Sequence, residues 1–143
     1  MQASPQAASQ KVTTRRLCVR PDQVAVARGL VARQLVLWGQ PGLVDSAVLI
    51  VSELATNVVR HAGGAGGTFA LTLRLETGAL VVEVSDCGRQ GRPEPREAGT
   101  EEESGRGLAL VGALAQTWGV RTGQGGRTVW VRLATEAGET CGC

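Results

Sequence analysis

The alternating segment between residues 68 and 86 constrains the fold more than any other part of this sequence. In its first half, every second position from Phe69 to Leu75 is apolar, and most of the residues between are polar. A short turn, Thr77-Gly78, leads into a second apolar run that ends at Asp86. This pattern predicts a β-hairpin with one apolar face. Because an isolated hairpin is marginally stable in water, other elements must cover that face.

Two segments before the hairpin have the spacing of amphipathic helices. The first runs from Asp22 to about Trp38 and follows Pro21, a residue suited to the first turn of a helix. The second runs from about Leu43 to His61, and the glycine-rich stretch 63–67 ends it. A strand is expected ahead of both helices, from Lys11 to Arg20.

The C-terminal part supplies the remaining elements. A third helix is expected after Gly105, and two closing strands are expected at Trp118–Arg121 and Arg127–Leu133. These elements predict an α+β fold, a two-layer sandwich in which a mixed, mostly antiparallel sheet is covered on one face by three helices. We expect a disordered segment over 1–11, one domain over 12–133 and a flexible tail over 134–143.

Composition excludes several classes of function. A formal net charge of +2 over 143 residues, with one Phe, three Trp and no Tyr, gives no strong case for binding nucleic acid or an anionic membrane. Residues 1–10 have neither the basic start nor the apolar stretch of a signal peptide, and no apolar run reaches the length of a membrane span, so a cytoplasmic protein is expected. The four cysteines match neither a zinc site nor a redox pair. Cys141 and Cys143 suit either metal or redox chemistry or an inert terminus.

Glu53 and Asn57 are the first candidate functional residues. They lie four residues apart on the polar side of the second helix, so their side chains share one helix face. Magnesium prefers oxygen ligands such as an Asn carbonyl, and a carboxylate one turn away can accept a proton. The alternative is that both residues line a solvated helix face.

Asp86 is the second candidate. It shares the phase of the apolar residues in its strand, which points it inward, and a buried carboxylate is costly unless it is paired. The exocyclic amine of adenine would satisfy it, and Gly88 would let the backbone approach a flat ring closely. The alternative is that Asp86 caps a turn.

The third candidate is the run Ser104-Gly105-Arg106-Gly107, directly before the expected third helix. Free backbone amides at a helix N-terminus suit phosphate, and Arg106 adds a guanidinium that can meet phosphate oxygens. The alternative is an ordinary flexible turn. The preceding segment, 88–104, is long and has no apolar pattern, which is typical of a binding lid.

Taken together, these three motifs resemble those of a known ATPase superfamily, which includes gyrase, the heat-shock chaperone, histidine kinases and mismatch-repair proteins. The first motif of that superfamily is similar to the run Val51-Ser52-Glu53-Leu54-Ala55-Thr56-Asn57-Val58-Val59-Arg60-His61. Asp86-Cys87-Gly88 is similar to its adenine motif, and Gly105-Arg106-Gly107-Leu108 to its last glycine motif. The small size and the ending Gly126-Arg127-Thr128-Val129-Trp130 resemble in particular the stand-alone anti-sigma-factor serine/threonine kinases of actinomycete type. The likeness covers about residues 12–133.

The resemblance implies ATP and Mg²⁺ as cofactors and a role for each motif. Asn57 would bind the metal, Glu53 would be the catalytic base, Asp86 would hold adenine with Gly88 beside it, and Gly105, Arg106 and Gly107 would line the phosphates. It further implies phosphorylation of a serine on a small anti-anti-sigma partner and alternative binding of a sigma factor, and it is compatible with a homodimer.

One departure from the family pattern precedes the last glycine motif. Glu103, after Glu101 and Glu102, stands where kinases of this group can carry an arginine. Three carboxylates near a polyphosphate are unfavourable unless they face solvent. Arg106 or a lid arginine (Arg89, Arg92 or Arg96) would compensate.

Three functions are therefore open on the sequence. The first is a serine kinase that also acts as an anti-sigma factor, which Glu53 favours because a pure binder needs no base. The second is a non-catalytic, ATP-dependent module that sequesters a partner, which the acidic run 101–103 favours. The third is the catalytic part of a histidine kinase. His61, the only histidine, lies at a helix end within the first motif, which favours a structural role over a phospho-accepting one.

Overall fold

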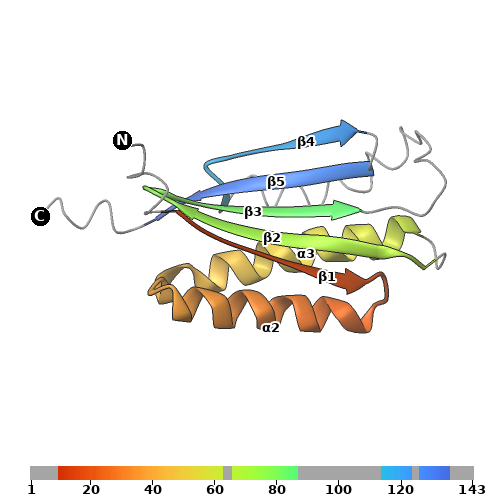
Figure 1. The fold of residues 1–143 in the computed structure, drawn as a ribbon, viewed down its shortest axis with the longest axis horizontal. Coiled ribbons are helices and arrows are strands. Elements are labelled where there is room, and N and C mark those ends of the chain that lie inside the picture. Colours follow the sequence, from red (N-terminus) through yellow and green to blue (C-terminus); the bar gives the residue numbers. More distant parts are fainter. Residues whose placement is uncertain (1–9, 63–65, 87–113, 124–125, 136–143) are drawn as a thin grey trace, which may run out of the picture.

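The structure is a computed structural model that describes residues 10–62, 66–86, 114–123 and 126–135. Its elements in chain order are β1 (Lys11–Cys18), α2 (Asp22–Leu37), the short 3₁₀ helix η1 (Pro41–Leu43), α3 (Val44–Ala62), β2 (Thr68–Glu76), β3 (Ala79–Asp86), β4 (Thr117–Gly123) and β5 (Gly126–Ala134). The five strands form one sheet in the order β1-β2-β3-β5-β4. Figure 1 shows α2 and α3 side by side on one face of this sheet.

The expected α+β two-layer sandwich is confirmed, with differences in detail. All four strand pairings among the described residues are antiparallel, whereas a mixed sheet was expected. The helix expected after Gly105 lies outside the described residues, apart from its last positions at Leu114 and Ala115. β1 ends at Cys18, two residues before the expected Arg20.

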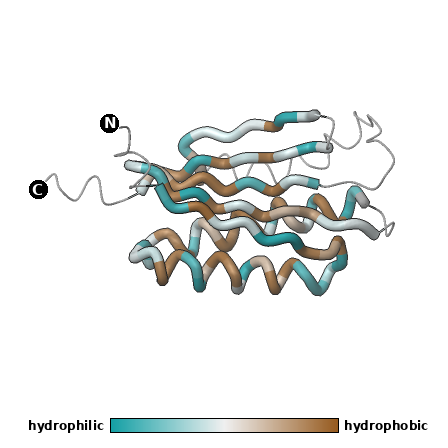
Figure 2. The backbone as a smooth tube through the Cα atoms, viewed as in Figure 1, coloured by the Kyte–Doolittle hydropathy of each residue, from teal (hydrophilic) through white to brown (hydrophobic). Residues whose placement is uncertain are grey.

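The core lies between the helices and the sheet. The alternation of β2 buries Phe69, Leu71, Leu73 and Leu75, which are at most 9% exposed, and leaves the intervening positions half-buried. The largest fully buried side chains come from both layers: Leu35, Ile50 and Leu54 from the helices, and Phe69, Leu73 and Leu80 from the sheet. Figure 2 shows hydrophobic residues along both helices and along the strands of the sheet. Burial of this extent against one sheet face fixes how α3 is rotated about its axis.

The connection between the two helices depends on one glycine. Gly39 has φ +75°, a conformation that glycine adopts at little cost. Its amide donates to the carbonyl of Val36, and the amide of Gln40 donates to that of Leu35, so two carbonyls in the last turn of α2 are satisfied. η1 then turns the chain into α3, so α3 begins at Val44 rather than at Leu43.

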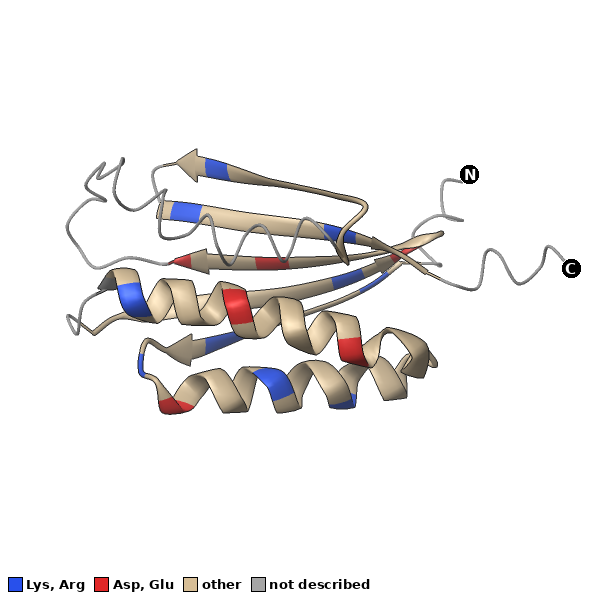
Figure 3. Cartoon of the chain, turned by 180° about the vertical axis from the view of Figure 1, so that it is seen from behind, with Lys and Arg blue, Asp and Glu red and all other residues tan. Residues whose placement is uncertain are grey.

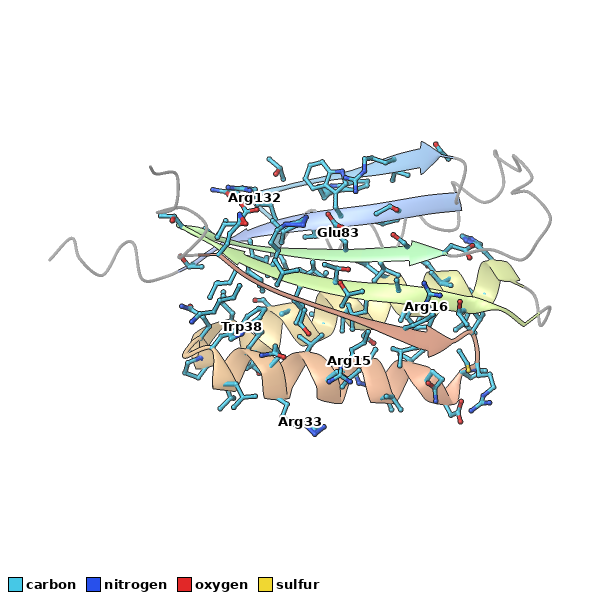
Figure 4. All side chains as sticks on the ribbon, viewed as in Figure 1. Arg15, Arg16, Arg33, Trp38, Glu83 and Arg132 are labelled. Carbon is cyan, nitrogen blue, oxygen red and sulfur yellow. The ribbon has the colours of Figure 1, made fainter. Side chains whose placement is uncertain are left out.

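The other face of the sheet carries a chain of ion pairs across four strands. The carboxylate of Glu83 forms ion pairs with the guanidinium groups of Arg74 and Arg121, with N–O distances of 2.6 and 3.6 Å. The carboxylate of Glu76 forms ion pairs with Arg132 at 3.1 Å and with Arg74 at 3.4 Å. Figure 4 shows Glu83 and Arg132 on this side, away from the helices. Paired charges suit a face that no described helix covers.

No apolar run was expected to reach the length of a membrane span, but one stretch does so. By length and composition alone, Pro41–His61 could cross a membrane, with a hydropathy of 1.5. A core helix of a soluble protein passes the same test. Here Ile50, Val51, Leu54 and Ala55 of this stretch are packed in the core and at most 1% exposed.

Candidate functional site

α3 presents Glu53 and Asn57 one turn apart, and both side chains are half-buried. Their neighbours Leu54 and Ala55 are at most 1% exposed, so the apolar contacts of α3 determine where the polar pair lies. Within the described part of the chain, Glu53 forms no ion pair. Its carboxylate is therefore not committed to a structural cation there.

α3 is also tied to its neighbouring helix. The guanidinium of Arg28, on α2, donates to the hydroxyl of Ser52 at 3.4 Å. His61 lies exposed in the last turn of α3, and its structural role there stays a prediction from the sequence. The hydrogen bond between Arg28 and Ser52 links α2 to the middle of α3, next to Glu53.

Asp86 is the last residue of β3, and it lies on the core-facing side of that strand, in phase with Val82 and Val84. Those two residues are at most 1% exposed, whereas Asp86 is half-buried because the strand ends there. The C-terminal ends of α3 and β3 lie at the same end of the molecule (Figure 1). Asp86 lies at that end, whereas Glu53 lies near the middle of α3 and Asn57 lies one turn closer to the C-terminus of the helix.

Gly126, the first residue of β5, approaches the end of β3 closely. A Cβ atom at this position would overlap the backbone oxygen of Asp86, and φ is +125°. Only glycine suits that combination. The last strand was expected to begin at Arg127, and no local pattern in the sequence predicts the contact between Gly126 and Asp86.

An open cavity of about 450 Å³ lies at the ends of β3, β4 and β5. Asp86 and Gly126 line it, together with Ser85, Arg121, Thr122, Gly123 and Thr128. The hydroxyls of Ser85 and Thr128 are 2.6 Å apart at its wall. Of the described residues that line this cavity, none belongs to α3. Thr128 lies opposite both Ser85 and Arg121 in neighbouring strands, and all three side chains are on the face of the sheet that points away from α3. The cavity therefore adjoins Asp86 but does not contain Glu53 or Asn57.

Several predicted site residues lie outside the described residues. They are Gly88, Gly105, Arg106 and Gly107, together with the expected lid 88–104 and the acidic run 101–103. Their assignments remain predictions from the sequence.

Asn57 and Glu53 offer oxygen ligands of the kind that magnesium accepts. Among the described residues, no group of three or more His, Cys, Asp or Glu side chains is placed to hold a metal ion. Magnesium commonly takes one or two protein ligands and completes its shell with phosphate and water oxygens. The amide oxygen of Asn57, with the Glu53 carboxylate one turn away, is a donor set of that kind.

Comparisons with known proteins identify the family of the domain. Residues 17–133 match the family model of the histidine kinase-like ATPase domain. The protein SCO4941 of Streptomyces coelicolor is 43% identical over 72 residues, which cover 49% of this chain and 68% of that protein.

A solved structure has the same fold. The crystal structure of the RsbU and RsbW domains of Rv1364c from Mycobacterium tuberculosis superposes with a TM-score of 0.66 and 18% identity. The match covers 87% of this chain and 32% of that chain, so the present chain spans about a third of that larger protein. With the family model matching most of its length, the chain belongs to the histidine kinase-like ATPase domain family.

Proposed function

We propose that this chain is an ATP-dependent protein serine/threonine kinase that phosphorylates a small anti-anti-sigma partner and, in alternation, sequesters a sigma factor. Membership of the ATPase domain family supports nucleotide binding, and the resemblance of the motifs to anti-sigma-factor kinases supports the choice of partners. The observation that carries the kinase activity is Glu53: a half-buried carboxylate on α3, without an ion pair among the described residues and one turn from Asn57.

In the proposed reaction, Asp86 accepts a hydrogen bond from the adenine amine and so orients ATP at the end of β3. Asn57 would hold magnesium, which when bound supplies positive charge against the phosphate oxygens. Glu53 accepts the proton of the partner's serine hydroxyl as the serine oxygen attacks the γ-phosphorus. The bond between the γ-phosphorus and the bridging oxygen breaks, and ADP leaves with that oxygen.

A second candidate is a module that binds its partners in an ATP-dependent way without phosphate transfer. The observation that favours it is the run Glu101-Glu102-Glu103, where kinases of this group can carry an arginine. Carboxylates beside the γ-phosphate would oppose the charge stabilisation that phosphoryl transfer requires.

The two candidates are separated by replacing Glu53 with glutamine. Glu53→Gln keeps the shape of the side chain and removes the base, so ATP should still bind while transfer to the partner's serine falls by about 10²–10⁴-fold. The matched control is Asp45→Asn, which removes an exposed carboxylate from the first turn of the same helix. Its transfer rate should equal that of the wild type.

The measurement is transfer of labelled γ-phosphate to a small anti-anti-sigma protein that binds the chain. Equal rates for wild type and Glu53→Gln would show that Glu53 is not the base. If the wild type binds both ATP and partner but transfers nothing, the kinase assignment is wrong and the non-catalytic module replaces it.

A further inference from the structure

β1 forms one edge of the sheet, and among the described residues no strand pairs with its outer side. Its eight residues pair with β2 in one continuous antiparallel register, from Lys11 opposite Leu75 to Cys18 opposite Thr68. The strand therefore contains no bulge, and it contains no proline. Those are two of the devices that commonly prevent an edge strand from pairing further. The backbone of β1 is regular enough to accept another strand.

The side chains along this edge are strongly basic. Lys11, Arg15 and Arg16 are all exposed, and within the described residues none of them forms an ion pair. β1 contains no acidic residue. Arg20, just after the strand, is different because it donates to Asp22 at 3.2 Å, and this hydrogen bond raises the pKa of its guanidinium. The positive charge of β1 itself is not neutralised in this way.

The cations flank both sides of the edge. Arg15 lies opposite Leu71 of β2, whose side chain is buried toward the helices, and Arg16 lies opposite Ala70 on the other face. Figure 4 shows Arg15 on the side of α2 and Arg16 on the opposite side of the strand. A segment paired with β1 would therefore meet positive charge on both of its faces.

The positive charge of β1 favours some binding partners for its outer edge over others. A second copy of the chain would bring three cations from each strand onto one ribbon, and like charges on facing strands are destabilising. Single-stranded nucleic acid is disfavoured because β1 has no aromatic side chain on which bases could stack. An acidic segment gains both the backbone hydrogen bonds and the opposite charge.

We infer that the outer edge of β1 is a docking site for an extended, acidic segment of a partner protein, which adds to the sheet as a further strand. This inference goes beyond the proposed function, because it rests on β1 alone and requires neither nucleotide nor phosphate transfer. Figure 3 marks both acidic and basic residues on α2, α3 and the rest of the sheet, whereas β1 has three basic residues and no acidic one.

The test uses the full chain and three synthetic peptides of about ten residues, a usual length for a strand. The first alternates glutamate with threonine, and the second has lysine in place of glutamate. The third has the glutamate sequence with N-methyl groups on alternate backbone nitrogens, which keeps the charge and removes the donors that pair with an edge. Binding is measured by fluorescence anisotropy at low and at high salt, without nucleotide.

We expect the acidic peptide to bind about tenfold tighter than the lysine peptide, and salt to weaken its binding. N-methylation should weaken binding by about tenfold or more because the backbone hydrogen bonds are lost. On the protein, the pair Arg15→Glu and Arg16→Glu should reverse the preference between the two charged peptides. The matched control is Arg33→Glu, which alters an exposed cation that points away from β1 on α2 (Figure 4) and should change affinity by less than about twofold.

Three results would overturn the inference. The N-methylated peptide could bind as tightly as the parent, anionic vesicles or single-stranded DNA could bind better than the acidic peptide, or Arg33→Glu could weaken binding as much as the β1 pair. Circular dichroism on each variant checks that it is folded. If the charge-reversed pair unfolds, Arg15→Gln with Arg16→Gln keeps the test valid, and it should abolish the preference for the acidic peptide without reversing it.

Discussion

Replacing Gly126 with alanine tests how closely β5 approaches the end of β3. Two costs combine at this position. A non-glycine residue at a left-handed φ costs about 1–2 kcal/mol, and φ here is +125°. The new Cβ would also overlap the backbone oxygen of Asp86, and forced overpacking of this kind typically costs about 1–3 kcal/mol. The free energy of unfolding should therefore fall by about 2–5 kcal/mol.

Gly78→Ala is the matched control. Gly78 also has a positive φ, +80°, but a Cβ there would meet no atom within 4 Å. This variant should lose only the conformational part, about 1–2 kcal/mol. Gly78 lies in the turn at the opposite end of β3 from Asp86, so its substitution should leave ATP affinity unchanged. Gly126→Ala should weaken ATP binding because the strand end that carries Asp86 must shift.

The assay is urea unfolding followed by circular dichroism, with calorimetric titration of ATP on each folded variant. The difference between the two variants isolates the contact between Gly126 and Asp86. If both lose the same stability, β5 does not approach Asp86 as closely as the structure describes. If Gly126→Ala is destabilised but binds ATP normally, Asp86 has no part in the nucleotide site.

Three further predictions concern the proposed nucleotide site and the sheet. Asp86→Asn should cost on the order of 1–3 kcal/mol of ATP affinity, because the amide presents a donor to the adenine amine; unchanged affinity by calorimetry would remove Asp86 from the site. ATP binding should require magnesium and should weaken in Asn57→Ala, since one oxygen ligand is lost; the same affinity with and without a chelator would contradict this assignment. Gly119→Ala should displace the indole of Trp130, which a new Cβ would meet at 2.7 Å, and should cost about 1–3 kcal/mol of stability. Its tryptophan fluorescence should shift, and an unchanged spectrum and stability would show that the indole does not lie over Gly119.

The local pattern of the sequence was sufficient for most of the elements. Alternation over residues 68–86 predicted the β2–β3 hairpin and its end at Asp86, because a side-chain period of two depends only on neighbouring residues. The spacing of Glu53 and Asn57 on one face of α3 was predicted for the same reason, from the helical period. The resemblance of the motifs then pointed to the ATPase family, which the family model confirmed.

Only the tertiary structure decided the strand order and the contacts that depend on it. β5 lies between β3 and β4, so all the described pairings are antiparallel, and no local pattern contains that information. The same order brings Gly126 against Asp86 and places Arg74, Glu83 and Arg121 from three strands in one ion-paired row. It also leaves β1 at the edge of the described sheet, with its cations beside a backbone that no described strand pairs on its outer side. Residues that are distant in sequence meet only when the whole sheet and its covering helices pack together, so their contacts result from the fold and not from the spacing of any single segment.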